Sequence, residues 1–399
     1  MIPIMRVLVI AFGSRGDVAP FTGVGARLRA DGHAVTIAAH PAYAGLVTGA
    51  GLAFHALPGD LGVMQDLPEN ASPRFMAGRV GALTELLGQA ADASIAAAQD
   101  AEVVLWNGAA PFARDIAAGL GRPGFGVYCQ PWTPTGDFPP VALHSARSLG
   151  RWGNRLVSEL VMRTLVPYQR AARRVRDQLG GPRPGPEQRR LHGFSPAVLP
   201  RPADWPAGHD VVGYWWPVTD PSWTPPQQLV DFLDAGDPPV LVGFGSMAGG
   251  HGARLAPIVR EALRTAGVRG LVQSGWAGMD AGASDDVLTI ADVPHEWLLP
   301  RVAAVVHHAG AGTTAATLRA GVPSVPTPVF ADQPLWARRL VELGCAPAVL
   351  PFRGMAAAPL AAAIRAATSG GHRGAAAALA ARIAQEDGAG AVVAAVAAL

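Results

Sequence analysis

Hydrophobic positions gather into short, continuous runs that alternate with longer stretches of mixed polarity. Such apolar runs are typical of strands buried on both faces of a parallel sheet, and the mixed stretches between them favour helices. In the first half of the chain the pattern predicts helices at about 20–30 and 111–120, and strands at 6–12, 34–39, the end of 99–106, and 124–129.

The same alternation starts again in the second half. It predicts helices at 253–266, after 310, at 356–367 and at 374–384, and strands at 239–244, 270–273, 287–290, 303–307 and 322–326. Both halves open with a strand and a Gly-rich loop, at 13–17 and 245–250. Strands separated by helices indicate α/β architecture with doubly wound sheets. Because ligands of such sheets bind beyond the carboxyl ends of the strands, we expect two Rossmann-like domains facing each other across a cleft.

The middle of the chain lacks this alternation of strands and helices. A long helical pattern with Arg on its polar face covers 145–179, and the Gly- and Pro-rich segment 180–186 ends it. A second stretch, 200–226, is rich in Pro and Trp and has the character of a domain boundary. The predicted division is an N-terminal domain at 1–205, a linker at 206–225 and a C-terminal domain at 226–399.

The amino-acid composition of the chain excludes several classes of function. All 32 basic residues of the 399-residue chain are Arg, against 30 acidic residues, so the net charge is +2. The absence of Lys excludes Schiff-base and P-loop lysine chemistry, and the lack of a basic run argues against a nucleic-acid partner. Two cysteines cannot form a disulfide framework, and no apolar run is long enough for an integral membrane segment. With an N-terminus that runs straight into a strand, we expect a cytoplasmic protein; the Arg-only, Ala-rich composition suggests a bacterial source.

The segment 306–314 carries the strongest candidate chemistry. A buried strand delivers His308, and a small-residue loop with Gly310 and Gly312 then opens a helix. Glycines let backbone N–H groups approach a ligand closely, and a helix N-terminus favours an anion such as a diphosphate. The hydroxyl of Thr313 adds a donor. The alternative is a tight turn with Thr313 as the N-cap.

A second motif follows twenty residues later. Asp332 and Gln333 stand just beyond a predicted strand, in the Pro-bounded segment 326–334. A carboxylate beside an amide suits several sugar hydroxyls at once. The alternative is that Asp332 caps the helix that carries Trp336.

Taken together, several ordered segments resemble family 1 glycosyltransferases with the GT-B fold, above all the branch of bacterial antibiotic and sterol glucosyltransferases. The matching segments are 13–20, 130–133, 291–300, 308–313, 321–323 and 332–333. The resemblance implies an inverting transfer from a nucleoside-diphosphate sugar, with no metal, no cofactor, and a last helix that crosses back to the N-terminal domain.

It also implies roles for individual residues. The donor diphosphate would be held by Ser246 together with His308, Gly310, Gly312 and Thr313; the base by the backbone at Val293; and the donor sugar by Asp332 and Gln333. Two positions depart from the family pattern. Ala316 stands where a ribose-binding Glu is common, and Asp292 where a base-stacking Trp is usual. These departures leave a thymidine (TDP) donor open beside a uridine (UDP) donor.

Asp17 is the predicted general base, because a carboxylate near an acceptor hydroxyl can take its proton during attack, and burial raises its pKa. The alternatives are that Asp17 caps the following helix or pairs with Arg15. Phe75, Trp132 and Phe138 are the predicted acceptor-binding aromatics, although loop aromatics are more often packing residues.

The prediction is therefore transfer of a hexose or deoxyhexose to a hydroxyl of an apolar small molecule such as an antibiotic-type natural product. One alternative is a sterol or lipid glucosyltransferase that uses UDP-glucose, and another is a non-catalytic nucleotide-sugar-binding protein. A dinucleotide-dependent oxidoreductase is disfavoured because 13–17 does not form G-x-G-x-x-G. The sequence leaves the oligomeric state open.

Overall fold

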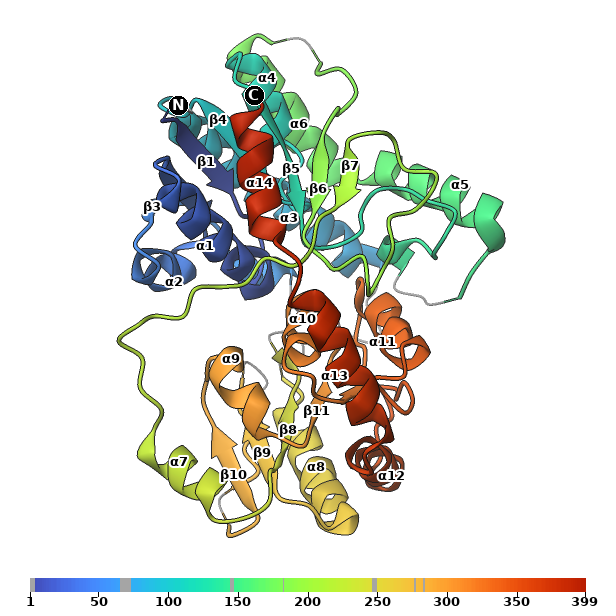
Figure 1. Cartoon of the computed structure of the whole chain (residues 1–399). Coiled ribbons are helices and arrows are strands. Elements are labelled where there is room, and N and C mark those ends of the chain that lie inside the picture. The colour runs from blue at the N-terminus through green and yellow to red at the C-terminus, as the bar shows by residue number, and fades with distance from the viewer. Residues whose placement is uncertain are drawn as a thin grey trace.

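Two parallel sheets, one in each half of the chain, organise the computed structural model (Figure 1). The structure describes residues 4–64, 73–143, 147–181, 183–245, 250–275, 278–282 and 284–399. The two sheets belong to two domains stacked one above the other, as expected for a GT-B arrangement.

The N-terminal sheet has seven strands in the order β3-β2-β1-β4-β5-β6-β7, and every neighbouring pair is parallel. The chain winds outward in both directions from β1, so the switch point lies between β1 and β4, where ligands of doubly wound sheets bind. The strands are β1 (Arg6–Ile10), β2 (Ala34–Ala39), β3 (Ala53–Ala56), β4 (Val103–Trp106), β5 (Gly124–Tyr128), β6 (Arg190–His192) and β7 (His209–Val211).

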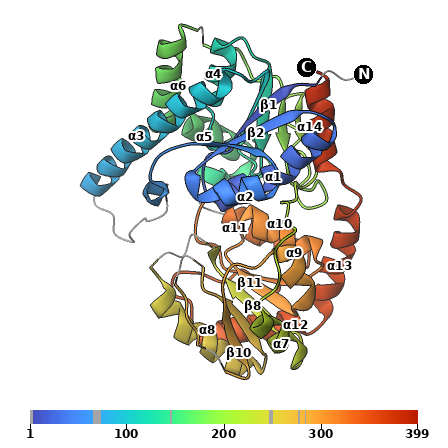
Figure 2. The same cartoon turned by 90° about the vertical axis from the view of Figure 1, so that its left-hand side faces the viewer.

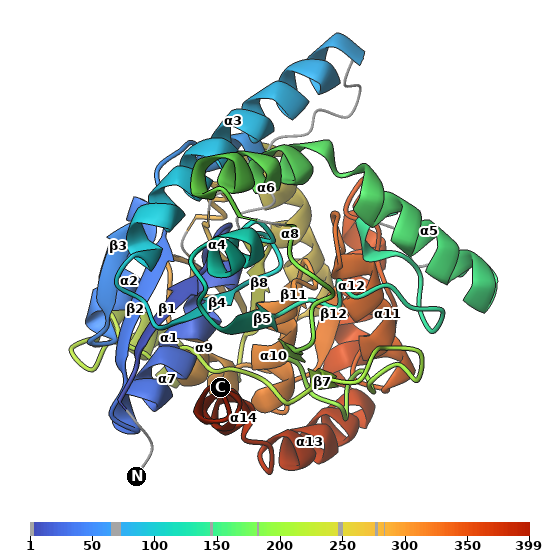
Figure 3. The same cartoon turned by 90° about the horizontal axis from the view of Figure 1, so that it is seen from above.

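Helices cover both faces of this sheet. Seen from above, α3, α4 and α6 lie on one side of the strands, and α1 lies with α14 on the other (Figure 3). This double cover explains why β1 and β4 are apolar on both faces. The helices are α1 (Arg15–Ala30), α2 (Ala44–Gly49), α3 (Pro73–Ala98), α4 (Ala113–Gly119), α5 (Gly150–Thr164) and α6 (Val166–Leu179), with 3₁₀ turns at Pro41–Tyr43, Leu61–Met64 and Val141–Leu143.

The C-terminal sheet has five parallel strands in the order β10-β9-β8-β11-β12. They are β8 (Val240–Gly243), β9 (Gly270–Gln273), β10 (Val287–Ile290), β11 (Ala304–His307) and β12 (Ser324–Pro326). Its helices are α7 (Gln227–Asp234), α8 (Gly252–Ala266), α9 (His295–Leu298), α10 (Ala311–Arg319), α11 (Gln333–Glu342), α12 (Ala357–Thr368) and α13 (Gly371–Ile383), with a 3₁₀ turn at Leu299–Arg301.

The last helix, α14 (Gly388–Ala397), returns to the N-terminal domain and packs on α1 (Figure 2). Val392 and Val396 are fully buried in the same core as β1. The indole Nε1 of Trp215 donates to the carbonyl oxygen of Gly388 at 3.0 Å, which ties the returning segment to the outgoing one. The N-terminal domain therefore depends on the C-terminal end of the chain.

Two boundaries differ from the sequence-based expectation. The strand β7 (His209–Val211) lies inside the segment 206–225 that was predicted as linker. Three residues are too few to show a strand pattern within a Pro- and Trp-rich segment. Helix α1 begins at Arg15 rather than near Pro20. Ser14 is its N-cap and Asp17 its third residue, so most of the predicted loop is the first helical turn.

A buried cluster joins the domains beside the linker. It contains Phe138 and Trp205 from the N-terminal domain and Trp336 from α11. The rings of Phe194 and Trp336 meet edge to face with centroids 5.5 Å apart. Within the described part of the chain, no helix has the length and apolarity needed to cross a bilayer.

Candidate active site

A cavity of about 1800 Å³ lies between the two domains. The switch-point region of the N-terminal sheet forms one wall, and the loops after β8, β11 and β12 form the other. Most of the predicted site residues line it: Asp17, Trp132, Val293, His308, Gly310, Gly312, Thr313, Asp332 and Gln333.

Asp17 is held in place by two sets of hydrogen bonds. Its Oδ2 accepts from the backbone N–H of Ser14 at 2.9 Å and from the Ser14 hydroxyl at 2.8 Å. Its Oδ1 accepts from Nε2 of Gln130 at 3.0 Å. A Cβ at Gly13, whose φ is +124°, would lie 2.5 Å from Oδ2, so only glycine allows the carboxylate this position.

Burial raises the pKa of Asp17, and the hydrogen bonds from Gln130 and Ser14 oppose the rise. The carboxylate is thus a stronger base than an exposed one, while its donors keep it oriented. The predicted alternative of a capping role also holds, since Asp17 occupies the capping-box position of α1. The two roles are compatible because Oδ1 faces Gln130 rather than the helix end.

His308 is enclosed between two glycines. A Cβ at Gly245 would lie 2.9 Å from its Cε1, and a Cβ at Gly310 would lie 2.4 Å from its Nε2. Burial and the nearby His295 lower the pKa of His308 to about 4. The imidazole is therefore neutral at neutral pH and donates one N–H without carrying a charge.

The side chain of His307 stabilises the turn that leads into α10 by a hydrogen bond to its backbone. Its Nδ1 accepts from the backbone N–H of Ala309 at 3.1 Å, and Ala309 adopts a left-handed conformation with φ +60°. Helix α10 then begins with Gly310 as its N-cap, so Thr313 lies in the first turn and is not the cap. Gly310, Gly312 and Thr313 of this turn line the cavity. The first turn of a helix has backbone N–H groups without an intrahelical partner, and such groups suit an anion.

Asp332 and Gln333 lie in a similar turn after β12. Ala331 has a φ of +57°, the second left-handed non-glycine residue among those described. Asp332 Oδ2 accepts from the indole Nε1 of Trp336 at 2.6 Å. The Oε1 of Gln333 accepts from the N–H groups of Val329 and Phe330, so its amide nitrogen is what it can offer a ligand. Strained turns of this kind recur at ligand sites.

The carboxylates of Asp17 and Asp332 interact electrostatically across the cavity. Burial raises the pKa of Asp332 to about 6, the Trp336 hydrogen bond opposes the rise, and the charge on Asp17 adds to it. Asp17 comes from the N-terminal domain and Asp332 from the C-terminal domain, so the site is complete only when both domains are present.

At the end of the cavity where the base is expected, Val293 is buried and Ala316 lines the wall. Asp292 is exposed and forms an ion pair with Arg15 at the start of α1, across the cleft. Arg15 therefore does not pair with Asp17, which was one of the alternatives. In the described part of the chain, no three His, Cys, Asp or Glu residues form a metal-binding group.

The aromatic residues predicted to bind the acceptor do not all lie at the cavity. Trp132 lines the cavity and packs on Gly108, where a Cβ would lie 2.7 Å from the indole. Phe138 is buried in the cluster that joins the domains and is not among the cavity-lining residues, because its Pro-rich loop turns towards Trp205. The side chain of Phe75 and the whole of Ser246 lie outside the described residues.

Gln130 and Asn107 support the site in ways that the sequence pattern does not indicate. Both follow strands of the N-terminal sheet at the edge that faces the cleft, and that position is the signal that could have identified them. Gln130 orients Asp17, and Asn107 Nδ2 donates to the carbonyl oxygen of Phe12 at 2.7 Å. Together they fix the loop that carries Asp17.

Comparison with known proteins agrees with this geometry. Residues 7–136 match the glycosyltransferase family 28 N-terminal domain, and residues 279–399 match the erythromycin biosynthesis protein CIII-like C-terminal domain. The chain is 36% identical to the O-mycaminosyltylonolide 6-deoxyallosyltransferase of Streptomyces fradiae, over 92% of this chain and 90% of that protein. The chain belongs to the family 1 glycosyltransferases with the GT-B fold.

Other relatives are longer than this chain, which spans less than two thirds of their length. It is 32% identical to the sterol 3-beta-glucosyltransferase UGT80B1 of Arabidopsis thaliana, over 91% of its own length but 63% of the plant protein. Among solved structures, the glycosyltransferase SnogD from Streptomyces nogalater superposes with a TM-score of 0.71 at 19% identity, covering 99% of each chain. SsfS6 of Streptomyces sp. SF2575, solved with thymidine diphosphate, gives 0.65 at 22% identity over 99% of this chain and 100% of that one.

Proposed function

We propose that this glycosyltransferase moves a hexose or deoxyhexose from a nucleoside-diphosphate sugar to a hydroxyl of an apolar small molecule, with inversion at the anomeric carbon. The observation that carries the proposal is that Asp17 and the loops of His308 and Asp332 line one cavity from opposite domains. A donor on the C-terminal loops and an acceptor on the N-terminal wall would meet beside Asp17.

Asp17 is the proposed general base. The acceptor oxygen attacks the anomeric carbon while its proton passes to the Asp17 carboxylate, and the bond from that carbon to the diphosphate oxygen breaks. Attack from the face opposite the leaving group inverts the configuration. The raised pKa of Asp17 supports this role, because a more basic carboxylate accepts a proton more readily.

The diphosphate leaves with an additional negative charge. Backbone N–H groups in the first turn of α10 and the neutral imidazole of His308 are the proposed donors to that charge, a positioning and electrostatic contribution. Asp332 and the amide of Gln333 are proposed to bind the sugar hydroxyls, and the Val293 backbone the base. No metal or cofactor enters this scheme.

The names of the relatives support a natural-product acceptor. The Streptomyces relative that matches along nearly its full length is named for a deoxysugar transfer to a tylonolide, and thymidine diphosphate is bound in SsfS6. Ala316 supports the same donor class, since it leaves the ribose without the carboxylate that a 2′-hydroxyl would engage. A sterol acceptor with UDP-glucose is the second candidate, favoured by the plant relative.

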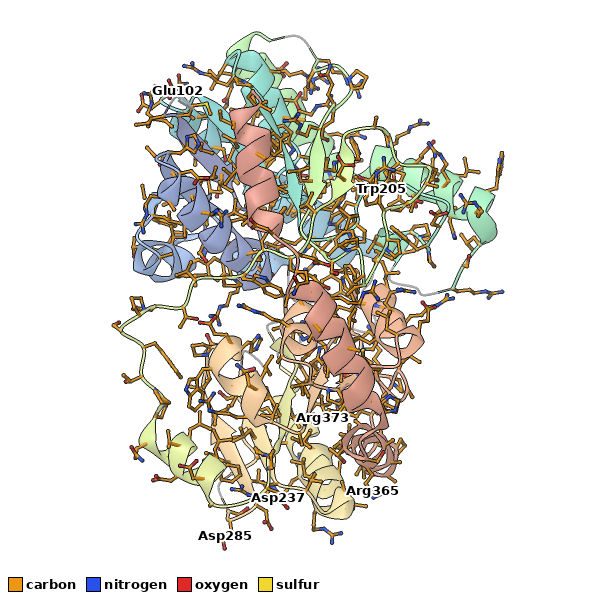
Figure 4. All side chains as sticks on the ribbon, in the orientation of Figure 1. Glu102, Trp205, Asp237, Asp285, Arg365 and Arg373 are labelled. Atoms are coloured by element: carbon orange, nitrogen blue, oxygen red, sulfur yellow. The ribbon has the colours of Figure 1, made fainter. Side chains whose placement is uncertain are left out.

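A direct test compares Asp17→Asn with the wild-type protein. We expect kcat to fall about 10²- to 10⁴-fold, while thymidine diphosphate still raises the melting temperature of the variant as it does that of the wild type. Asp237→Asn, at the far end of the C-terminal domain (Figure 4), is the matched control and should keep full activity. A variant with kcat within a few-fold of wild type would show that Asp17 is not the base.

The donor is tested by melting the wild-type protein with TDP- and UDP-sugars. Stabilisation by the TDP forms alone supports the deoxysugar route, and stabilisation by UDP-glucose alone supports the sterol-type alternative. No shift with either nucleotide contradicts the donor site itself. Stabilisation without turnover on any acceptor panel would favour the non-catalytic alternative.

A further inference from the structure

One wall of the cavity is strongly basic. It is formed by α4, α6 and the segment 183–190, which together contribute two carboxylates, Asp115 and Glu187, and six arginines: Arg114, Arg170, Arg173, Arg176, Arg183 and Arg190. The cavity-lining residues of this wall carry a net charge of +4, or +3 once Asp177 of α6 is counted, against +2 for the entire chain. All of it belongs to the N-terminal domain.

Three of these arginines are already paired. Arg176 pairs with Asp115, Arg190 with Glu187, and Arg173 with Asp177 at 3.8 Å. Such pairs hold the wall together and leave little charge for a ligand.

The other three carry the inference. Among the described residues, Arg114, Arg170 and Arg183 have no carboxylate or hydrogen-bond partner, yet all three line the cavity. Arg114 is half-buried, whereas Arg170 and Arg183 are exposed to solvent, so the desolvation argument applies to Arg114. A partly desolvated guanidinium without a partner is costly, and an anion placed in the cavity would remove that cost.

Arg114 lies near Tyr128, whose ring supplies aromatic surface on this wall. Burial raises the pKa of Tyr128 to about 12, and the positive charges of Arg190 and Arg114 oppose the rise, which places Arg114 near this phenol. The guanidinium of Arg190 covers the Tyr128 ring at 4.4 Å. The cavity thus offers aromatic surface and unpaired positive charge side by side.

The donor diphosphate does not account for this wall. Its proposed site is on α10 of the C-terminal domain, where the cavity-lining arginine among the described residues is Arg319. That residue lies over the Trp216 ring at 4.5 Å and reaches Glu296 at 4.0 Å. The unpaired arginines lie on the opposite domain, on the side where the acceptor is proposed to bind.

We propose that the wall of α4, α6 and 183–190 binds a carboxylate of the acceptor. The acceptor class is then an apolar, hydroxyl-bearing molecule with an acidic group, its apolar body against Trp132 and Tyr128 and its carboxylate on Arg114 and its neighbours. This inference rests on the proposed function, because it names the acceptor class of the same site.

The probes are 6-hydroxy-2-naphthoic acid and its methyl ester, which share one skeleton and differ in charge. Both are titrated calorimetrically into the wild-type protein saturated with thymidine diphosphate, so that the donor anion site is filled. We expect the acid to bind at least about tenfold more tightly than the ester. The advantage should shrink as ionic strength rises from about 0.05 M to about 0.5 M.

Arg114→Gln and Arg183→Gln locate the effect. Each should weaken binding of the acid about tenfold and leave the ester unchanged, with thermal melting as the check of folding. Arg365→Gln removes the same charge from the far end of the C-terminal domain (Figure 4) and should change neither affinity. A loss for both probes alike would indicate a packing role and overturn the inference.

Equal affinity for acid and ester also overturns it, as does failure of both to bind. An acid preference that vanishes once thymidine diphosphate is present overturns it too, since the anion then occupied the donor site. The outcomes stay separate from the proposed function. Sugar transfer without acid preference contradicts only the inference, whereas acid preference without transfer on any acceptor contradicts only the activity.

Discussion

The hydrogen bond that Trp336 donates to Asp332 lowers the pH at which the Asp332 carboxylate ionises. Burial raises the pKa of Asp332 to about 6, and this bond, 2.6 Å long and buried, keeps it from rising further. Trp336→Phe removes the donor and retains an aromatic ring. The carboxylate should then ionise only at a higher pH.

The size of the change follows from the bond. A hydrogen bond to a charged group contributes about 1.5–3 kcal/mol, and about 1.4 kcal/mol corresponds to one pKa unit. The pKa of Asp332 should therefore rise from about 6 to roughly 7–8 in the variant. At pH 7 the ionised fraction falls from about nine tenths to between about a half and a tenth. kcat/KM for the donor should drop about two- to tenfold there and recover at higher pH.

The assay is kcat/KM for the donor sugar against pH. Trp205→Phe is the matched control, because Trp205 is buried in the same cluster and its indole donates to the Thr133 carbonyl instead (labelled in Figure 4). It should lose comparable packing and leave the midpoint of the profile in place. An unshifted midpoint in Trp336→Phe, or an equal shift in both variants, would refute the reasoning.

Three further variants probe other parts of the site and fold. Asp332→Asn should weaken binding of the donor sugar and raise the melting temperature at about pH 8 but not at about pH 4. The folded-state pKa of about 6 lies above the usual value of 3.8, so ionisation costs the native state up to about 3 kcal/mol as pH rises through that window. Gly310→Ala should push the His308 ring aside and weaken thymidine diphosphate binding, measured by calorimetry. Val396→Asp should lower the melting temperature strongly, since it puts a charge into the core beneath α1.

Each of these variants has a contradicting result. Unchanged stability of Asp332→Asn at both pH values would show that burial does not destabilise the carboxylate. Gly374→Ala, in open space on α13, is the control for Gly310→Ala and should leave nucleotide affinity intact. Ala394→Asp, on the exposed side of α14, is the control for Val396→Asp; equal losses in the two would contradict the packing of α14 on α1.

The strands that the sequence predicts well are the fully buried ones. β1, β8 and β11 are continuous apolar runs because helices cover both faces of each sheet. β3 and β6 were not predicted, since they are short, lie away from the sheet centre and are only partly buried or carry polar residues. Their strand state comes from pairing with neighbours, which the local sequence does not encode.

The candidate site also contains parts that the local sequence predicts and parts that it does not. The loops of His308 and Asp332 are each contained in one short segment, so their residue types reveal them. Contacts between distant segments do not appear in the pattern: Gln130 reaches Asp17 across 113 positions, and Arg15 reaches Asp292 across 277. Ala309 and Ala331 were not expected to be left-handed, since alanine has no local reason to be so.

The distribution of charge in the cavity suggests how a chain without Lys would bind two anions, the donor diphosphate and the proposed acceptor carboxylate. On the C-terminal side, the proposed diphosphate donors are backbone N–H groups and a histidine whose pKa of about 4 keeps it neutral. Neutral donors stabilise the leaving diphosphate without the stronger attraction of a full charge, which would slow its release. The unpaired positive charge is kept on the N-terminal wall, at Arg114, Arg170 and Arg183. The two proposed anion sites belong to different domains, so the nucleotide and the acceptor carboxylate would bind on opposite walls of the cavity. The division therefore helps to orient each substrate in its own half of the cleft.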